Sequence, residues 1–164
     1  MKIALATDHG GYEQLKELKN YLESLGHSCQ DFGPTRYNPE DDYPDFITPA
    51  AKAVASGDCD LGVVLGRSGQ GEAMAANRIK KVRCAVYYGP AVAKSAVDAS
   101  GEVSPDPYEI VKTSRKHNDA NMLSLAASYV SLEEMKNVIK VWLETPFSSA
   151  ERHTRRHQKL DVGN

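Results

Sequence analysis

The carboxylate of Glu72 follows a glycine-rich stretch, and together they have the composition of an acid–base site. The stretch reads GRSGQG over residues 66–71 and leads into a predicted short helix. Backbone N–H groups in such a loop, aided by the helix dipole, can hold an anion. Proton abstraction next to a carbonyl requires this pairing of a base with N–H donors for the oxyanion. The alternative is that Glu72 only favours the helix start through its charge.

A second polar pair, Asp8 and His9, stands in the sequence DHGG, directly after the first apolar run. A carboxylate and an imidazole at the end of a strand can contact a ligand bound there. The alternative is that Asp8 caps the following helix while the two glycines make the turn.

Two further stretches hold histidine and arginine side chains near the end of the chain. His117 stands in RKHNDAN, before an apolar run, where an imidazole can shuttle a proton on a sugar ring oxygen. Arg152 and Arg156 in ERHTRRH are four residues apart, so on a helix they share one face and can clamp a phosphate. Each stretch has a plainer alternative: RKHNDAN is a solvated polar turn, and ERHTRRH is a solvated basic tail at the end of a helix.

The sequence predicts acid–base chemistry without a metal. No His, Cys, Asp and Glu residues have the spacing of metal ligands, and no serine lies in a nucleophile elbow. The glycine stretch lacks the lysine of a P-loop, and no G-x-G-x-x-G follows the first predicted strand. The cysteines Cys29, Cys59 and Cys84 are scattered singly, which favours a reducing compartment.

Apolar runs and amphipathic stretches alternate along the chain, which predicts an α/β fold. The predicted strands are Lys2–Thr7, His27–Asp31, Leu61–Leu65, Arg83–Tyr87 and Met122–Ala126. The predicted helices are Glu13–Leu25, Asp45–Ser56, Glu72–Asn77, Pro90–Asp98 and Leu132–Leu143. Such alternation gives a doubly wound, five-stranded parallel sheet with helices on both faces and ligands at the carboxyl ends of its strands.

Length and composition predict one domain over residues 1–164, with a helical tail from about residue 147 to residue 164. Two polar segments, 32–44 and 100–107, interrupt the regular pattern without resembling domain linkers. The formal net charge of -2 demands neither nucleic acid nor an anionic membrane as partner. The sequence has no run of eighteen apolar residues and begins too polar for a signal peptide, so we expect a cytoplasmic protein.

Five motifs, taken in order, resemble the ribose-5-phosphate isomerase B family, which includes galactose-6-phosphate isomerase subunits. They are DHGG, DDYP, GRSGQGEAMAANR, RKHNDAN and ERHTRRH, and they span nearly the whole chain. The resemblance implies a flavodoxin-like, Rossmann-like sheet and a homodimer with shared active sites, with a tetramer left open. It also implies interconversion of ribose 5-phosphate and ribulose 5-phosphate through a cis-enediolate, without a cofactor.

The resemblance also implies roles for single residues. Glu72 matches the base that moves a proton between C2 and C1, whereas another branch of the family uses a cysteine at the position of Gly66. His117 matches the histidine that opens the furanose ring, and Asp8 matches a residue that contacts the ring or hydroxyls of the sugar, so either can assist ring opening. The residues implied to contact the sugar or the enediolate are Ser68, Gly69, Gly71, Tyr43, Asn77 and Asn118. Those implied to hold the phosphate are His9, Arg152, Arg156 and His153.

Two features depart from the family pattern. The family usually has an arginine where this sequence has Ser128, and the segment Ser100–Tyr108 resembles an insertion that can form a lid or displace His117. These departures leave open an isomerase of hexose 6-phosphates such as galactose or allose 6-phosphate. A second alternative, of a different class, is a sugar-phosphate-binding module without catalytic activity.

Overall fold

The computed structural model describes residues 1–98 and 101–162. Ser100, at the start of the predicted insertion, and residues 163–164 of the predicted tail lie outside the described residues.

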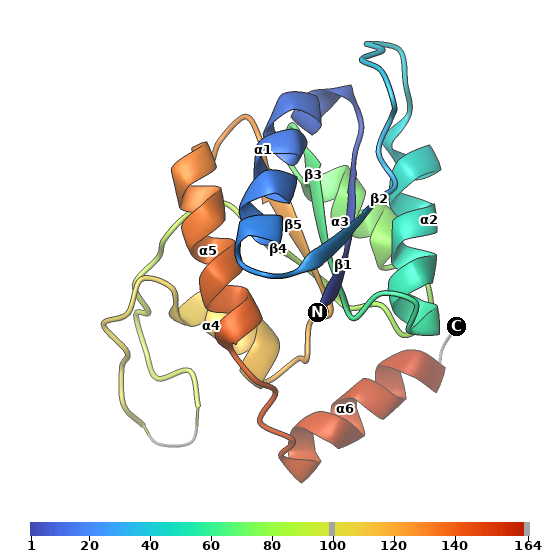
Figure 1. Ribbon diagram of the computed structural model, residues 1–164. Helices are drawn as coiled ribbons and strands as arrows, with labels where there is room; N and C mark the ends of the chain where they lie inside the picture. Colours follow the sequence, from blue (N-terminus) through green and yellow to red (C-terminus); the bar gives the residue numbers. More distant parts are fainter. Residues whose placement is uncertain (99–100, 163–164) are drawn as a thin grey trace.

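Five parallel strands form one sheet in the order β2-β1-β3-β5-β4 (Figure 1). The strands are β1 (Lys2–Thr7), β2 (Ser28–Asp31), β3 (Leu61–Gly66), β4 (Cys84–Tyr87) and β5 (Met122–Ala126). Because every neighbouring pair is parallel, all carboxyl ends lie along one edge, here called the carboxyl edge, and all amino ends along the opposite amino edge. The predicted five-stranded doubly wound sheet is confirmed.

Helices cover both faces of the sheet, α1, α4 and α5 on one and α2 and α3 on the other (Figure 1). The helical elements are a 3₁₀ turn η1 (His9–Gly11), α1 (Tyr12–Ser24), α2 (Tyr43–Ser56), α3 (Gln70–Ala76), α4 (Glu109–Lys116), α5 (Leu132–Glu144) and α6 (Glu151–Val162). Alternate residues of β1 serve the two layers, since Ile3 and Leu5 pack against α1 and α5 while Ala4 and Ala6 pack against α2. The buried strands therefore carry continuous apolar runs.

Local chemistry sets the helix boundaries near the carboxyl edge. Asp8 accepts a hydrogen bond from the Gly10 backbone N–H at 2.7 Å, which caps η1. Ser131 caps α5 by accepting from the Glu134 N–H at 3.2 Å. Gly69 begins α3 with φ 70, in the left-handed region where a side chain is disfavoured.

The predicted helix over Pro90–Asp98 is wrong, because the described chain there is irregular. Val92 and Val97 are both exposed, so no apolar stripe ties this stretch to the core, and a short helix without packing is unstable. The crossover to β5 instead contains α4, whose Val111 is 3% exposed in the core. The Ala91 N–H donates to the Pro107 carbonyl at 2.9 Å and joins the two ends of the long connection.

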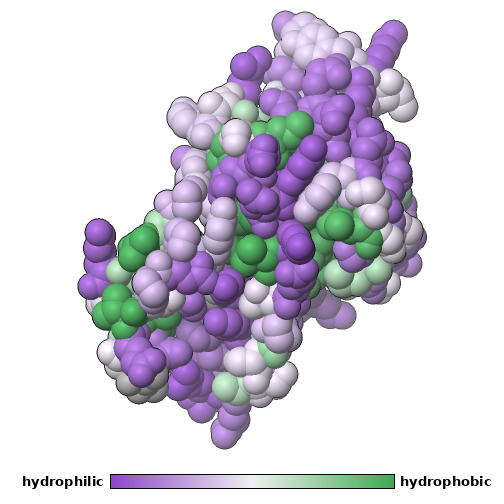
Figure 2. Space-filling model, turned by 60° about the vertical axis from the view of Figure 1, so that its left-hand side comes forward, coloured by the Kyte–Doolittle hydropathy of each residue, from purple (hydrophilic) through white to green (hydrophobic). Residues whose placement is uncertain are grey.

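The face that carries α4 and this connection is mostly hydrophilic, with separate hydrophobic areas (Figure 2). Helix α6 lies apart from the sheet, beyond the amino edge (Figure 1). Among the described helices, none has the length and apolar character needed to cross a bilayer.

Candidate active site

Glu72 lies in the first turn of α3 but does not point into solvent. The residue is only 5% exposed. An added Cβ on Gly66 would lie 1.8 Å from Glu72 Oε1, so the carboxylate rests against the last residue of β3. Burial raises the pKa of the Glu72 carboxyl, a backbone hydrogen bond partly offsets this, and the negative charge of Asp8 raises the pKa further. A carboxyl group held this way suits general base catalysis better than helix capping.

The loop between β3 and α3 is fixed by contacts with its neighbours. Ser124 on β5 donates a hydrogen bond from its hydroxyl to the Gly69 carbonyl at 2.6 Å. Ser68 accepts a hydrogen bond from the Gln70 N–H at 3.3 Å. A Cβ on Gly71 would lie 2.9 Å from the Tyr43 ring, so glycine lets the ring approach the loop closely. The structure thus gathers Ser68, Gly69, Gly71, Tyr43 and Glu72 at the carboxyl edge.

The Asp8–His9 turn joins the same edge from β1 and includes a third residue, Asp41. His9 Nδ1 lies 2.7 Å from Asp41 Oδ1, which also accepts from the His9 backbone N–H at 3.0 Å. A carboxylate can only accept, so in this bond Nδ1 carries the hydrogen and Nε2 is the free ring nitrogen. The Asp41 side chain is 8% exposed, and its Oδ2 is buried without a hydrogen-bond partner.

Within residues 1–98 and 101–162, Asp8, His9 and Asp41 form a group that could hold a cation, since three ligand-type atoms lie within 4.8 Å of one another. Two of the three atoms already form the His9–Asp41 hydrogen bond, and Asp8 caps η1. The cluster is thus engaged internally, with one carboxylate oxygen of Asp41 still able to accept a hydrogen bond. No local pattern indicates this contact, because Asp41 lies 32 residues from His9 in a polar loop.

The histidines predicted to contact substrate from the later motifs form a separate cluster. The rings of His117 and His153 stack with their centroids 4.5 Å apart. Arg152 Nε donates to His153 Nε2 at 3.1 Å, and Ser148 Oγ lies 2.9 Å from His153 Nδ1. Burial lowers the pKa of His153, and the nearby His117 lowers it further. Neutral His153 therefore accepts from Arg152 at one nitrogen and donates to Ser148 at the other.

This cluster lies at the opposite edge of the sheet from Glu72. His117 precedes β5, and the β3–β5 register pairs Gly62 with Met122 and Gly66 with Ala126. Those two pairs are four positions apart along the strands, a length of roughly 13 Å. One chain therefore does not bring His117, Asn118, His153 or Arg152 beside Glu72. Arg156 lies on the same amino-edge helix, α6.

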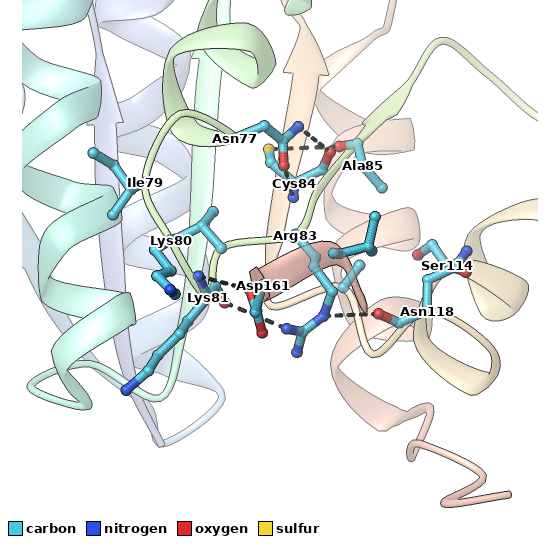
Figure 3. Close-up of a pocket in the computed structure, with 13 residues that line it drawn as sticks. Asn77, Ile79, Lys80, Lys81, Arg83, Cys84, Ala85, Ser114, Asn118 and Asp161 are labelled. Atoms are coloured by element: carbon cyan, nitrogen blue, oxygen red, sulfur yellow. Dashed lines mark hydrogen bonds between the residues drawn. The ribbon is translucent and has the colours of Figure 1, made fainter. Parts of the chain in front are cut away.

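The two predicted asparagines line a cavity of about 450 Å³ that opens beside the amino edge (Figure 3). Asn77 binds the backbone of Cys84 twice, donating at 2.9 Å and accepting at 2.8 Å, so its amide fixes α3 to β4. The Asn118 carbonyl accepts from Arg83 Nε at 2.9 Å. Glu72 is not among the residues that line this cavity.

None of the three cysteines is a favourable base. Burial raises the pKa of Cys29 to about 11 and also raises the pKa of Cys59. Burial raises the pKa of Cys84 as well, with the nearby negative charge of Glu72 adding to the shift. The thiolate is the reactive form, so these thiols are inert at neutral pH.

Comparison with known proteins gives one consistent result. Residues 3–101 and 106–160 match the family model described as Ribose/Galactose Isomerase, and the omitted residues 102–105 fall within the segment predicted to be an insertion. The chain is 33% identical over 156 residues to ribose-5-phosphate isomerase B of Mycobacterium tuberculosis, covering 95% of this chain and 85% of that protein. The relative from Mycobacterium leprae is 31% identical over the same share of each chain.

Solved structures agree with these relatives. Ribose-5-phosphate isomerase B of Clostridium thermocellum superposes with a TM-score of 0.83 at 34% identity, over 99% of this chain and 96% of that one. The enzyme of Mycoplasma genitalium, solved with bound ribulose 5-phosphate, gives a TM-score of 0.83 at 28% identity, over 99% and 95% of the two chains.

Proposed function

Because the chain belongs to the ribose/galactose isomerase family, we propose that it is a sugar-phosphate isomerase that interconverts ribose 5-phosphate and ribulose 5-phosphate. The observation that carries the proposal is the buried Glu72 carboxylate, held against Gly66 beside a glycine-rich loop. The relative from Mycoplasma genitalium, whose structure contains ribulose 5-phosphate, supports the choice of substrate.

In the proposed reaction Glu72 acts as the general base. Ionised Glu72 removes the proton from C2 of the open-chain aldose, and the electron pair moves to O1 to form a cis-enediolate. N–H groups of the loop containing Ser68, Gly69 and Gly71 stabilise the negative oxygen. The hydroxyl proton of O2 passes to O1, and Glu72 returns its proton to C1 while the C2–O2 bond becomes the carbonyl of the ketose. The raised pKa of Glu72 supports this role, because it brings the base closer to neutral pH.

The other carboxyl-edge residues bind the sugar in this proposal. Asp8 and Tyr43 contact the ring or hydroxyl groups, and Asp8 assists ring opening. His9 binds the phosphate as an imidazolium, donating from Nε2 while Nδ1–H donates to Asp41. Binding the distant phosphate holds C1 and C2 against the base, which lowers the entropic part of the barrier.

A second copy of the chain completes the site. The amino-edge cluster with His117, Asn118, Arg152 and Arg156 is unable to reach Glu72 within one chain. A two-fold axis perpendicular to the strands reverses their direction, so the amino edge of one subunit meets the carboxyl edge of the other. In the resulting homodimer His117 opens the sugar ring, Asn118 adds a hydrogen bond, and the arginines with His153 reach the phosphate.

The surface between α3 and the edge strand β4 suits this interface. Three apolar side chains border a groove there, Met74 at 62%, Val86 at 37% and Tyr88 at 46% exposure. Their burial against a second copy would remove apolar surface from water next to the helix that carries Glu72.

We further place the reaction in the non-oxidative pentose phosphate route and in the cytoplasm. The substrate pair supports the route, and the free thiols Cys29, Cys59 and Cys84 fit a reducing compartment.

A hexose 6-phosphate is the second candidate substrate, favoured by Ser128 in place of the usual arginine. The test is turnover of ribose 5-phosphate, allose 6-phosphate and galactose 6-phosphate by the purified protein. The proposal predicts the highest kcat/KM for ribose 5-phosphate. A clear hexose preference would replace the substrate, and binding without turnover of any sugar would identify a module without catalytic activity.

The shared site is tested with a heterodimer of Glu72→Gln and His117→Ala subunits, isolated through two different affinity tags. Each parent homodimer has two defective sites. In the heterodimer one site carries both changes and the other carries neither, so about half of the wild-type activity returns. A heterodimer no more active than its parents would show that each site lies within one chain.

A further inference from the structure

Arg67 lies between two turns of the carboxyl edge. A Cβ added to Gly10 would lie 2.9 Å from Arg67 Cγ and 3.0 Å from Arg67 N, so the arginine packs against the turn that carries His9. On the other side, the Ser128 N–H donates to the Arg67 carbonyl at 3.0 Å. The loops after β1, β3 and β5 therefore meet at Arg67.

The guanidinium of Arg67 is free to bind a ligand. Arg67 is exposed, and within residues 1–98 and 101–162 its side chain forms no hydrogen bond or ion pair. Other arginines of the chain are engaged, as Arg83 and Arg115 are with Asp119. A long, unpaired cation at the end of a buried strand can turn toward an anion in the crevice.

The carboxylates at this edge favour an additional cation beside a phosphorylated substrate. Asp8, Asp41 and Glu72 supply three carboxyl groups, and two of them, Asp8 and Asp41, flank the His9 ring at 3.8 and 2.7 Å. A phosphate dianion would be repelled by these groups unless cations stand nearby. Ser128, where the family usually has an arginine, provides no positive charge.

We propose that Arg67 is a substrate-binding residue that takes the phosphate together with His9, in place of the arginine usual at position 128. The proposal rests on the proposed function. Arg67 and Ser128 are joined by a backbone hydrogen bond, so a side chain from either position reaches the same part of the edge. The planar guanidinium donates two parallel hydrogen bonds to phosphate oxygens.

The test compares Arg67→Ala with the parent enzyme by KM and kcat for ribose 5-phosphate. Loss of a charge-assisted phosphate contact should raise KM by about tenfold or more while kcat changes by less than about threefold. Arg67→Lys keeps the positive charge but loses the planar guanidinium that donates two hydrogen bonds, so its KM should lie between those of the parent enzyme and Arg67→Ala. Lys52→Ala removes an exposed cation from α2 and should leave KM unchanged.

Adding Ser128→Arg to the Arg67→Ala variant should recover most of the lost affinity, a result that a merely structural role of Arg67 would not produce. Equal KM values for Arg67→Ala and Lys52→Ala in an active enzyme would overturn the proposal, and so would a double variant without recovery. Calorimetric binding of inorganic phosphate gives a readout independent of turnover. If the parent protein has no isomerase activity but Arg67→Ala still lowers its phosphate affinity, the isomerase function is refuted and the Arg67 contact stands.

Discussion

Gly66→Ala is a small substitution that should disable the general base Glu72 by displacing its carboxylate, although Glu72 itself is unchanged. The Cβ of alanine would lie 1.8 Å from Oε1 and 2.0 Å from Cδ of Glu72. Ordinary contact begins near 3.4 Å, so the carboxylate must move by more than about 1 Å. A displacement of that size at a reacting group costs about a hundredfold in rate, or about 2.7 kcal/mol of barrier. Gly66 is not among the glycines with positive φ, so its backbone accepts alanine.

The assay is steady-state isomerisation of ribose 5-phosphate, with thermal unfolding measured on the same samples. Gly62→Ala is the matched control, because it lies on the same strand and its Cβ would meet the flexible Met122 methyl at 2.9 Å. The control should lose some stability and little activity. A Gly66→Ala enzyme within about threefold of wild-type kcat would refute the inference that the Glu72 carboxylate works from its place against Gly66.

Three more predictions concern groups around the site. Burial raises the Glu72 pKa, so the folded protein retains a proton that the unfolded chain releases, and stability falls as pH rises above the ordinary value of 4.5. Glu72→Gln should therefore unfold at a higher temperature than wild type at pH 7, with the gain shrinking below pH 4.5; a gain that grows in acid would contradict the sign. Asp41→Asn removes the charged acceptor of His9 Nδ1 and should raise KM about fivefold with kcat nearly constant. In an enzyme that already carries His9→Gln, the same substitution should cause no further rise in KM. Asp119→Ala removes contacts to Arg83 and Arg115 at 3.0 and 3.1 Å and should cost about 2 kcal/mol in urea unfolding, whereas breaking the exposed Lys16–Glu13 pair should cost less than about 1 kcal/mol.

Most of the sheet could be predicted because β1, β3, β4 and β5 are short apolar runs, whereas the edge strand β2 reads SCQD and is only partly buried. The predicted helix over Pro90–Asp98 is wrong because Val92 and Val97 are exposed, and the helix propensity of the alanines alone does not hold so short a helix without packing. The chain places its crossover helix later. Helix α4 combines a polar sequence with the buried Val111 and Ser114, a weak signal for a helix of eight residues.

The site was only partly predictable, because several of its contacts join distant segments. The glycine stretch placed Glu72 at a helix start, but its inward turn onto Gly66 depends on three-dimensional packing. Asp41 was missed because nothing local links a polar loop to His9. The separation of His117 from Glu72 was available from chain order alone, since a residue before a parallel strand and a residue after one lie at opposite edges.

The role of Glu72 is decided by the kcat of Glu72→Gln on ribose 5-phosphate, measured with a folded, dimeric variant. Glutamine keeps the size of the side chain and removes the basic oxygen, so kcat should fall by at least about a hundredfold while KM stays within a few fold. A variant that isomerises the sugar at the wild-type rate would show that another group moves the proton.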